Sequence, residues 1–121
     1  MKAMKRLKKN KDFQVVFKQG QSFANRQFVI YLWKNPAHPY SRLGLSVSKK
    51  MGNAVMRNHI KRHVREIFRE LESNLVPGYD YVIISRRPVR TMSHHEMRGS
   101  LIHVLKKTGV VERPRYKEAE K

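Results

Sequence analysis

Basic side chains at helical spacing are the feature of this sequence that most clearly predicts chemistry. Arg57, Lys61, Arg65 and Arg69 lie four residues apart. In a helix, which turns about 100° per residue, they form one ridge, here called the basic ridge. Exposed helices usually pair opposite charges at this spacing, but the ridge contains no acid. Like charges so arranged predict contact with nucleic-acid phosphates. The alternative is the solvated face of a basic protein.

Carboxylates and histidines do not show the spacing of a catalytic metal site. A protein nuclease with two metal ions needs clustered carboxylates, and Asp12 and Asp80 have no acidic neighbour in the sequence. His59 and His63 have the i,i+4 spacing of a helical zinc pair, but positive side chains such as Lys61 lie between them and oppose cation binding. We therefore expect this chain to supply no catalytic residue and no metal ligand.

Aromatic side chains form a second candidate group. Phe13 and Phe17 are four residues apart, and Tyr31 follows on an expected strand. One interpretation is ordinary core. The other is a cleft in which bases stack on the rings, which tolerates any base because each has a π-face. The small side chains of Ser46 and Ser48 would leave room for a nucleic-acid strand if they face that cleft.

One long helix must position the basic ridge. Asn53 can cap its start, because the side-chain oxygen can accept a backbone N–H of the first turn, and Pro77-Gly78 is expected to end it. The apolar residues that recur at three- and four-residue steps, and so share one face, are Ile60, Val64, Ile67, Phe68, Leu71 and Leu75. The face with mixed charges consists of His59, His63, Glu66 and Glu70.

The remaining elements predict a single α+β domain. Strands are expected at 22–27, 28–34, 42–48 and 79–86. Helices are expected at 11–19, capped by Asn10, and from a capping box at Ser93 to about Gly109. The order is α-β-β-β-α-β-α, with a mixed sheet of about four strands and helices largely on one side. We expect three parts in the chain: a flexible basic arm at 1–9, the folded domain at 10–109 and a disordered charged tail at 110–121.

Composition restricts the partners further. The 121 residues include 27 Lys and Arg against 9 Asp and Glu, a formal net charge of +18, which favours nucleic acid. A membrane partner is not expected, because the apolar stripes are needed for a core and no apolar run is long enough to span a bilayer. There is no cysteine, as is typical of cytosolic proteins, and no secretory signal at the start.

The segment 49–66, KKMGNAVMRNHIKRHVRE, resembles the signature of the bacterial ribonuclease P protein subunit. That family has an Arg-Asn-Arg triplet, followed by Ile-Lys-Arg and a further arginine. This chain has RNH at 57–59, IKR at 60–62 and then Arg65, so histidine replaces the second arginine of the triplet. His59 also lies off the basic ridge on the helical projection. The resemblance extends from about residue 7 to residue 108.

The resemblance implies a cytoplasmic ribonucleoprotein whose RNA carries out Mg²⁺-dependent release of the 5′ leader from precursor tRNA. It implies a rare left-handed crossover through the long helix, where the general rule would give a right-handed one. The implied partners are the catalytic RNA and the leader, with no membrane or small-molecule substrate and no Mg²⁺ ligand in this chain. The implied RNA-binding residues are Lys49, Lys50, Asn53, Arg57, Asn58, His59, Lys61, Arg62 and Arg65. The implied leader-binding cleft consists of Phe13, Phe17, Tyr31, Ser46 and Ser48.

Two other functions stay open on sequence grounds. The chain could be a ribosomal or general RNA-binding protein with no part in cleavage, or a DNA-binding regulator with its long helix in a major groove. A ribosomal protein would co-sediment with ribosomal subunits, and a regulator would discriminate between DNA sequences. The RNA that co-purifies with the protein would distinguish the three.

Overall fold

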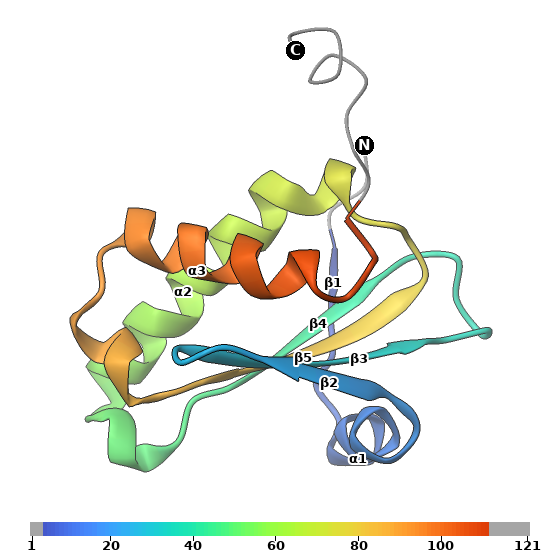
Figure 1. The fold of residues 1–121 in the computed structure, drawn as a ribbon. Helices are drawn as coiled ribbons and strands as arrows, with labels where there is room; N and C mark the ends of the chain where they lie inside the picture. Colours follow the sequence, from blue (N-terminus) through green and yellow to red (C-terminus); the bar gives the residue numbers. More distant parts are fainter. Residues whose placement is uncertain (1–3, 112–121) are drawn as a thin grey trace, which may run out of the picture.

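The computed structural model describes residues 4–111, which form a mixed five-stranded sheet with three α-helices (Figure 1). The elements are β1 (Lys5–Arg6), α1 (Asn10–Gln19), β2 (Gln21–Ala24), β3 (Phe28–Lys34), β4 (Arg42–Ser46), α2 (Ala54–Leu71), β5 (Tyr79–Ser85) and α3 (His94–Lys106). Short 3₁₀ turns lie at Lys49–Met51, Glu72–Asn74 and Arg87–Thr91. The expected α+β class and the order α-β-β-β-α-β-α are confirmed, with β1 added at the start.

The strand order across the sheet is β1-β4-β5-β3-β2. β4 is parallel to both of its neighbours, β1 and β5, and β3 is antiparallel to β5 and β2. Because β4 and β5 are adjacent and parallel, α2 forms the crossover between them. The left-handed sense of that crossover stays a prediction. Within residues 4–111, no helix combines the length and the apolar character that crossing a membrane requires.

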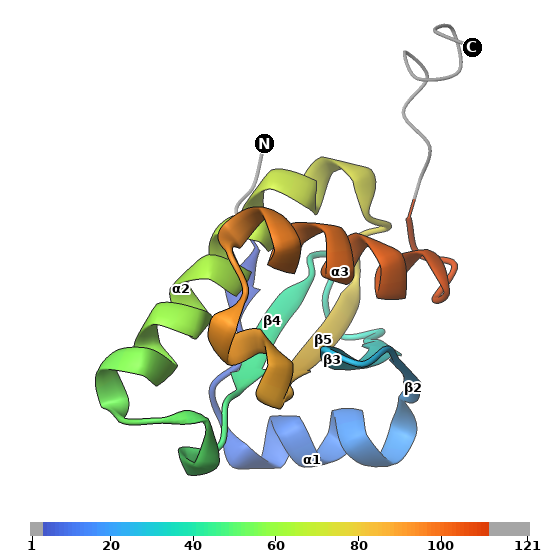
Figure 2. The ribbon, with the colours of Figure 1, turned by 60° about the vertical axis from the view of Figure 1, so that its left-hand side comes forward.

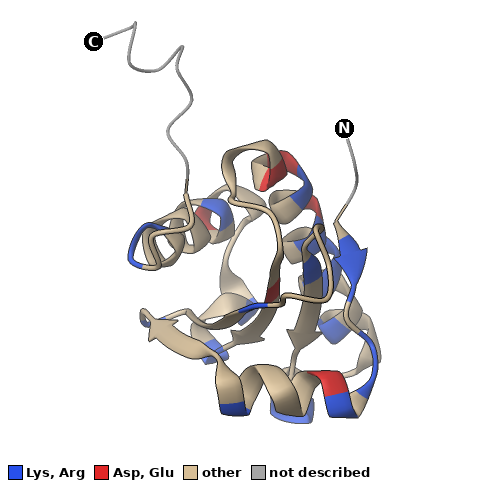
Figure 3. Cartoon of the chain, turned by 90° about the vertical axis from the view of Figure 1, so that its right-hand side faces the viewer, with Lys and Arg blue, Asp and Glu red and all other residues tan. Residues whose placement is uncertain are grey.

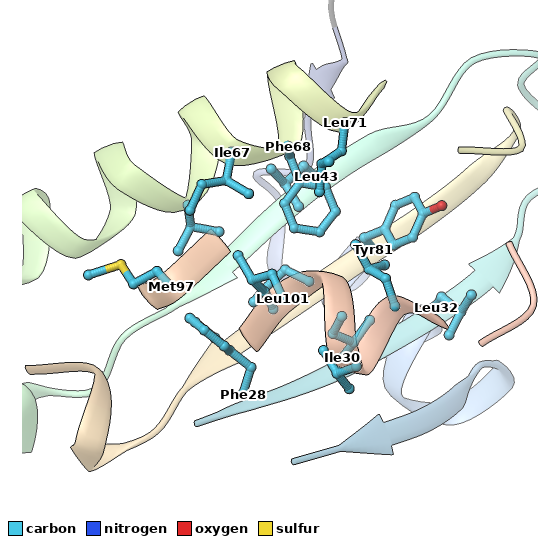
Figure 4. Close-up of a cluster of buried hydrophobic side chains, with 14 of the residues drawn as sticks. Phe28, Ile30, Leu32, Leu43, Ile67, Phe68, Leu71, Tyr81, Met97 and Leu101 are labelled. Carbon is cyan, nitrogen blue, oxygen red and sulfur yellow. The ribbon is translucent and has the colours of Figure 1, made fainter. Parts of the chain in front are cut away.

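The helices cover both faces of the sheet, not largely one. α2 and α3 lie on one face and α1 lies on the other (Figure 2). The larger core is between the sheet and the α2–α3 layer, where Phe28, Ile30 and Leu32 of β3 are buried (Figure 4). A smaller cluster forms beneath α1, where Val16 packs with Val82 of β5. Alternation along β3 therefore separates the two cores, and it turns Tyr31 toward α1.

Part of the segment expected to be a flexible basic arm, residues 1–9, forms the strand β1. Lys5 and Arg6 pair with Arg42 and Leu43, and the Leu7 N–H donates to the Leu43 carbonyl at 2.9 Å. Leu7 is only 4% exposed, in the cluster under α1. Burial of this one apolar side chain, together with the backbone pairing, holds the basic segment against β4. Residues 1–3 lie outside the described part of the chain.

The folded domain also extends beyond residue 109, where the sequence predicted that it would end. Val110 is buried, its carbonyl accepts the Val76 N–H at 2.8 Å, and Val111 forms a bridge with Leu75. These contacts end the domain at least two residues later than expected. The remainder of the expected tail, 112–121, lies outside the described residues.

The long helix α2 has the cap and the apolar face that its sequence predicts. The Asn53 side-chain oxygen accepts the Met56 N–H at 2.9 Å. The six residues of the apolar face are buried: Ile60, Val64, Ile67, Phe68, Leu71 and Leu75. The α-helix ends at Leu71, earlier than expected, because the chain tightens into a 3₁₀ turn and then leaves to pair with Val110. Tertiary pairing thus ends the helix before Pro77 is reached.

Other element ends differ from the expected ones for local reasons. Asn10 is the first residue of α1 and not its cap; Lys9 occupies that position without a side-chain hydrogen bond. β2 stops at Ala24 because the Asn25 side-chain oxygen accepts the N–H groups of Gln27 and Phe28, which forms a tight turn. The capping box that joins Ser93 to Glu96 at the start of α3 is confirmed.

A buried ion pair joins β4 to β5. Asp80 is 1% exposed, and its two carboxylate oxygens accept from Arg42 Nε at 2.9 Å and Nη2 at 2.7 Å. Asn35, at the end of β3, donates to the same carboxylate at 2.9 Å. Asp12 of α1 lies 3.5 Å from Arg42 Nη1. The two aspartates that are isolated in the sequence therefore share one arginine.

We expect Asp80→Ala to lower the free energy of unfolding by roughly 3–5 kcal/mol, because it leaves a largely buried guanidinium without its partner. Asp12→Ala is the matched control. Its carboxylate is more exposed and more distant, so the loss should stay below about 1 kcal/mol. Urea unfolding of both variants measures the difference. Equal losses would show that Arg42 does not depend on Asp80.

Candidate nucleic-acid interface

Along α2 the basic ridge is half-buried at Arg57, Lys61 and Arg65 and exposed at Arg69, and β1 extends it. Arg65 and Arg69 line a hollow together with Lys5 and Arg6 of β1. Figure 3 shows basic positions of β1 beside those of α2. Partial burial, and secondly the nearby Arg6 charge, lower the pKa of Arg65. The fold thus holds like charges together, which is favourable only if an anion binds them.

A second hollow, of about 280 Å³, joins the basic ridge to the aromatic group. Phe13 of the aromatic group and Lys61 and Arg65 of the basic ridge all line it. Arg6 and Lys8, which precede α1, add two more cations to its wall. Members of the two groups that the sequence suggested separately, Phe13 and the ridge cations, therefore line the same hollow. The part played by residues 6–8 was missed, because a two-residue strand has no readable periodicity.

The aromatic group lies between α1 and the sheet. The ring centroids of Phe17 and Tyr31 are 4.9 Å apart in an edge-to-face arrangement, and those of Phe13 and Phe17 are 6.4 Å apart. All three side chains are half-buried against the smaller cluster around Val16 and Val82. They support α1, as the core interpretation requires, and they also retain exposed surface, as a stacking site requires.

Gly44 of β4 sets the position of the Phe13 ring. A Cβ at residue 44 would lie 2.6 Å from Phe13 Cζ, so the ring rests directly on the strand backbone. Ser46 lies two residues further along β4 and therefore on the same side, half-buried. Ser48 lies beyond the strand, where its hydroxyl accepts the Lys50 N–H at 3.3 Å. Of the two serines, only Ser46 belongs to the sheet face under α1.

The loop before α2 carries the remaining expected RNA contacts. Lys49 and Lys50 are exposed on a 3₁₀ turn, and Asn53 is exposed at the helix cap. Arg57 Nε donates to the Gly52 carbonyl at 3.2 Å, which ties the first arginine of the ridge to this loop. Asn58 and Arg62 are also exposed on α2. Together these residues form one basic surface with the ridge.

The face of α2 with mixed charges lies against α3. His59 is exposed there, off the ridge, and its Nε2 is 3.1 Å from His63 Nε2. Burial, followed by the charges of His59 and His94, lowers the pKa of His63. Glu70 pairs with Arg98 of α3 at 3.0 Å. The sequence placed the acids correctly on this face but did not identify their partners in α3.

Three groups of this face converge closely enough to hold a metal ion. They are His63, Glu66 and His94, whose ligand atoms lie within 4.8 Å of one another. His94 was missed as a member because it is 31 residues from His63 in the sequence. Asp12 and Asp80, the carboxylates considered for a nuclease centre, both contact Arg42.

Comparisons with known proteins agree on one family. The ribonuclease P family model matches residues 1–109. The ribonuclease P protein component of Geobacillus sp. (strain WCH70) is 55% identical over 113 residues, 93% of this chain and 97% of that protein. The solved Staphylococcus aureus RNase P protein has a TM-score of 0.83 and 48% identity, covering 88% of this chain and 97% of that one. The RNase P protein from Thermotoga maritima has a TM-score of 0.78 and 38% identity, covering 85% and 96%.

Alanine at Arg57, Lys61 or Arg65 should weaken RNA binding and reduce the slope of log affinity against log salt by about one phosphate contact each. Arg98→Ala is the matched control, because it removes the same charge from α3, where Arg98 pairs with Glu70. Glu70→Gln should be neutral or slightly favourable. Filter binding at several salt concentrations measures these slopes. Equal losses of RNA affinity in all variants would contradict the conclusion that the RNA-binding cations lie on one face of α2.

His59→Ala should reduce RNA affinity less than Arg57→Ala does, because His59 lies on the mixed face and contacts His63. Binding measured at two salt concentrations compares the two variants. A larger loss at His59 would show that the histidine keeps the contact made by the family's second arginine.

Proposed function

This chain belongs to the bacterial ribonuclease P protein family, and we propose that it binds both the catalytic RNA and the 5′ leader of precursor tRNA. The family is the protein component of a ribonucleoprotein endonuclease that acts in tRNA processing, and such a protein has an RNA as its partner. The catalytic RNA and the leader would contact two adjoining surfaces of the chain.

The observation that carries the proposal is the hollow between the aromatic group and the basic ridge. Its lining combines the ring of Phe13 with the cations Lys61 and Arg65. A single-stranded nucleic acid needs this combination, since its bases stack on aromatic faces while its phosphates are neutralised by cations. A duplex could not use the rings, because its bases are already stacked on one another.

The leader would lie across the sheet face beside α1. Phe13, Phe17 and Tyr31 offer half-exposed rings there, and Gly44 has no side chain that would lift Phe13 off the strand. Lys8, at the other edge of the hollow, would contact a phosphate. We also assign Ser46 to this cleft, whereas Ser48 would act mainly by capping the 3₁₀ turn.

The catalytic RNA would bind the exposed surface of α2 and the loop before it. The residues assigned to this contact are Lys49, Lys50, Asn53, Arg57, Asn58, His59, Lys61, Arg62 and Arg65. Neutralising phosphates here would reduce repulsion between the RNA and its substrate, so that they associate at lower magnesium. Lys61 and Arg65 belong to both surfaces, and we infer that the leader and the catalytic RNA meet beside them.

Mg²⁺ would act within the RNA. It prefers several oxygen ligands in octahedral geometry. Five of the described carboxylates already have partners of their own: Asp12 and Asp80 share Arg42, Glu66 and Glu70 face His94 and Arg98, and Glu96 is part of a helix cap. We therefore assign no Mg²⁺ ligand and no catalytic residue to this part of the chain. Its role would be to position RNA and neutralise phosphates, in the cytoplasm where a tRNA precursor is available.

The alternatives from the sequence predict different partners. A ribosomal or general RNA-binding protein would not need the aromatic group to distinguish precursor tRNA from mature tRNA. A DNA-binding regulator would place α2 in a major groove, where the adjoining strand β1 would also have to fit. Sequencing the RNA that co-purifies with the chain separates these possibilities. The proposed function requires the catalytic RNA and tRNA precursors to predominate.

Phe17→Ala and Tyr31→Ala should each weaken binding of precursor tRNA to the reconstituted particle by tenfold or more, since one stacked base contributes about 1–3 kcal/mol. Affinity for mature tRNA, which has no leader, should not change. Trp33→Ala is a control, because Trp33 shares the β3 face of Tyr31 and packs against the smaller cluster but is not one of the rings assigned to the leader cleft.

Thermal stability of the same variants tests the core interpretation. If the rings serve only packing, the variants melt early and lose affinity for precursor and mature tRNA in parallel, as a large-to-small core change would cause. That result would contradict the proposed leader cleft. It would leave family membership and the basic surface intact.

A further inference from the structure

We propose that His63, Glu66 and His94 form a binding site for a transition-metal ion of the Zn²⁺ class, which links α2 to α3. Its three ligands are not among the residues assigned to the catalytic RNA or to the leader cleft, although His59, which contacts His63, belongs to the RNA-binding set. The sequence argued against a metal at His59 and His63 because Lys61 lies between them. In the structure, Lys61 faces the hollow beside Phe13, and the partner of His63 is a histidine from another helix.

The convergence of two ring nitrogens carries the inference. His63 Nδ1 and His94 Nδ1 are 2.7 Å apart, a hydrogen-bond distance, so the two ring nitrogens face each other and a bound metal ion would replace the proton between them. Glu66 Oε1 is 4.0 Å from His94 Nδ1 and lies one helical turn after His63 on α2. Ligands at Zn²⁺ bond lengths in a tetrahedral site are about 3.3 Å apart. The three separations run from 2.7 Å to at most 4.8 Å, so rotamer adjustments of about 0.6 to 1.5 Å would bring the atoms to that spacing.

The outer nitrogens of both rings face groups that can orient them. His63 Nε2 is 3.1 Å from His59 Nε2, and His94 Nε2 is 3.8 Å from Glu70 Oε2. A ring that donates its outer N–H to such a neighbour keeps its inner nitrogen unprotonated for the metal, and metal-binding histidines commonly have partners of this kind. His59 and Glu70 are therefore positioning residues, not ligands.

The chemistry of the three groups selects the ion. Two imidazoles and one carboxylate suit Zn²⁺ and Co²⁺ and do not suit Mg²⁺, which prefers oxygen. The carboxylates of Glu66 and Glu70 offset the ion's charge on a face where Arg62 and Arg98 are the opposing cations. His94 is 32% and Glu66 46% exposed, so a fourth position would be open to solvent. Ser93 caps α3 directly before His94 and fixes the backbone there.

Titration of the full-length chain without an affinity tag or RNA tests the site. Zn²⁺ should raise the thermal midpoint by several degrees, on the order of 5–10 °C at a hundredfold excess over its dissociation constant. Co²⁺ should give the visible absorption of a four-coordinate site, and Mg²⁺ should produce neither effect. A chain that binds neither Zn²⁺ nor Co²⁺ at micromolar concentration would overturn the proposal.

Variants identify the ligands. His94→Ala and Glu66→Gln should each abolish the Zn²⁺-induced shift and the Co²⁺ spectrum while retaining the circular dichroism of the folded chain, since both side chains are partly exposed. His95→Ala is the matched control, an exposed histidine in the same helical turn, and should respond like the unaltered chain. His59→Ala should lower affinity by about tenfold or more but retain the spectrum, as expected of a positioning residue.

Three other results would contradict the assigned ligands. An unchanged response in His94→Ala or Glu66→Gln would remove that residue from the site and overturn the ligand set. A loss in His95→Ala as large as in His94→Ala would indicate nonspecific histidine binding, and complete loss in His59→Ala would make His59 a ligand. Because RNA is not present in the assay, failure of the metal site would leave the proposed ribonuclease P function untouched.

Discussion

The Arg42–Asp80 ion pair is the contact on which the positions of the other elements depend. It lies across the parallel pair β4 and β5, where residues 42 and 80 are direct register partners. Hydrogen bonding to Asp80 raises the pKa of Arg42, with burial acting in the opposite direction. Asn35 attaches the end of β3 to the same carboxylate, and Asp12 brings the first turn of α1 toward the arginine. Because a shift in the register of β4 and β5 would separate this buried charge from its hydrogen-bond partners, the ion pair fixes that register.

The proposed interface follows from that register. With residue 42 beside residue 80, Gly44 lies beside Val82, and this is the part of the sheet on which Phe13 and Val16 of α1 rest. β4 also offers its other edge to β1, which brings Arg6 next to Arg65 of α2. One strand thus positions Phe13 of α1 through Gly44, and through its pairing with β1 it adds Arg6 to the cations of the hollow.

The parts predicted well from the sequence are those that a single element determines. Periodicity was enough for the apolar face of α2, and local hydrogen-bonding preferences were enough for the caps at Asn53 and Ser93. Contacts between distant segments were not predictable in this way. A two-residue strand has no pattern, and nothing local indicates that His94 meets His63 or that Gly44 makes room for Phe13. The candidate site residues could be named, but not the hollow that joins them.

The distribution of acids explains how so basic a chain can fold and still attract a polyanion. Asp12 and Asp80 are engaged by Arg42, Glu66 and Glu70 face His94 and Arg98, and Glu96 closes its own helix cap. These contacts stabilise the packing of α1, β5 and α3, and none of these acids lines the hollow formed by Arg6, Lys61 and Arg65. Repulsion among those cations is therefore not offset by any acid that lines the hollow. It is relieved when phosphates enter, so the charges that reduce the stability of the free chain are the same ones that favour its RNA-bound form.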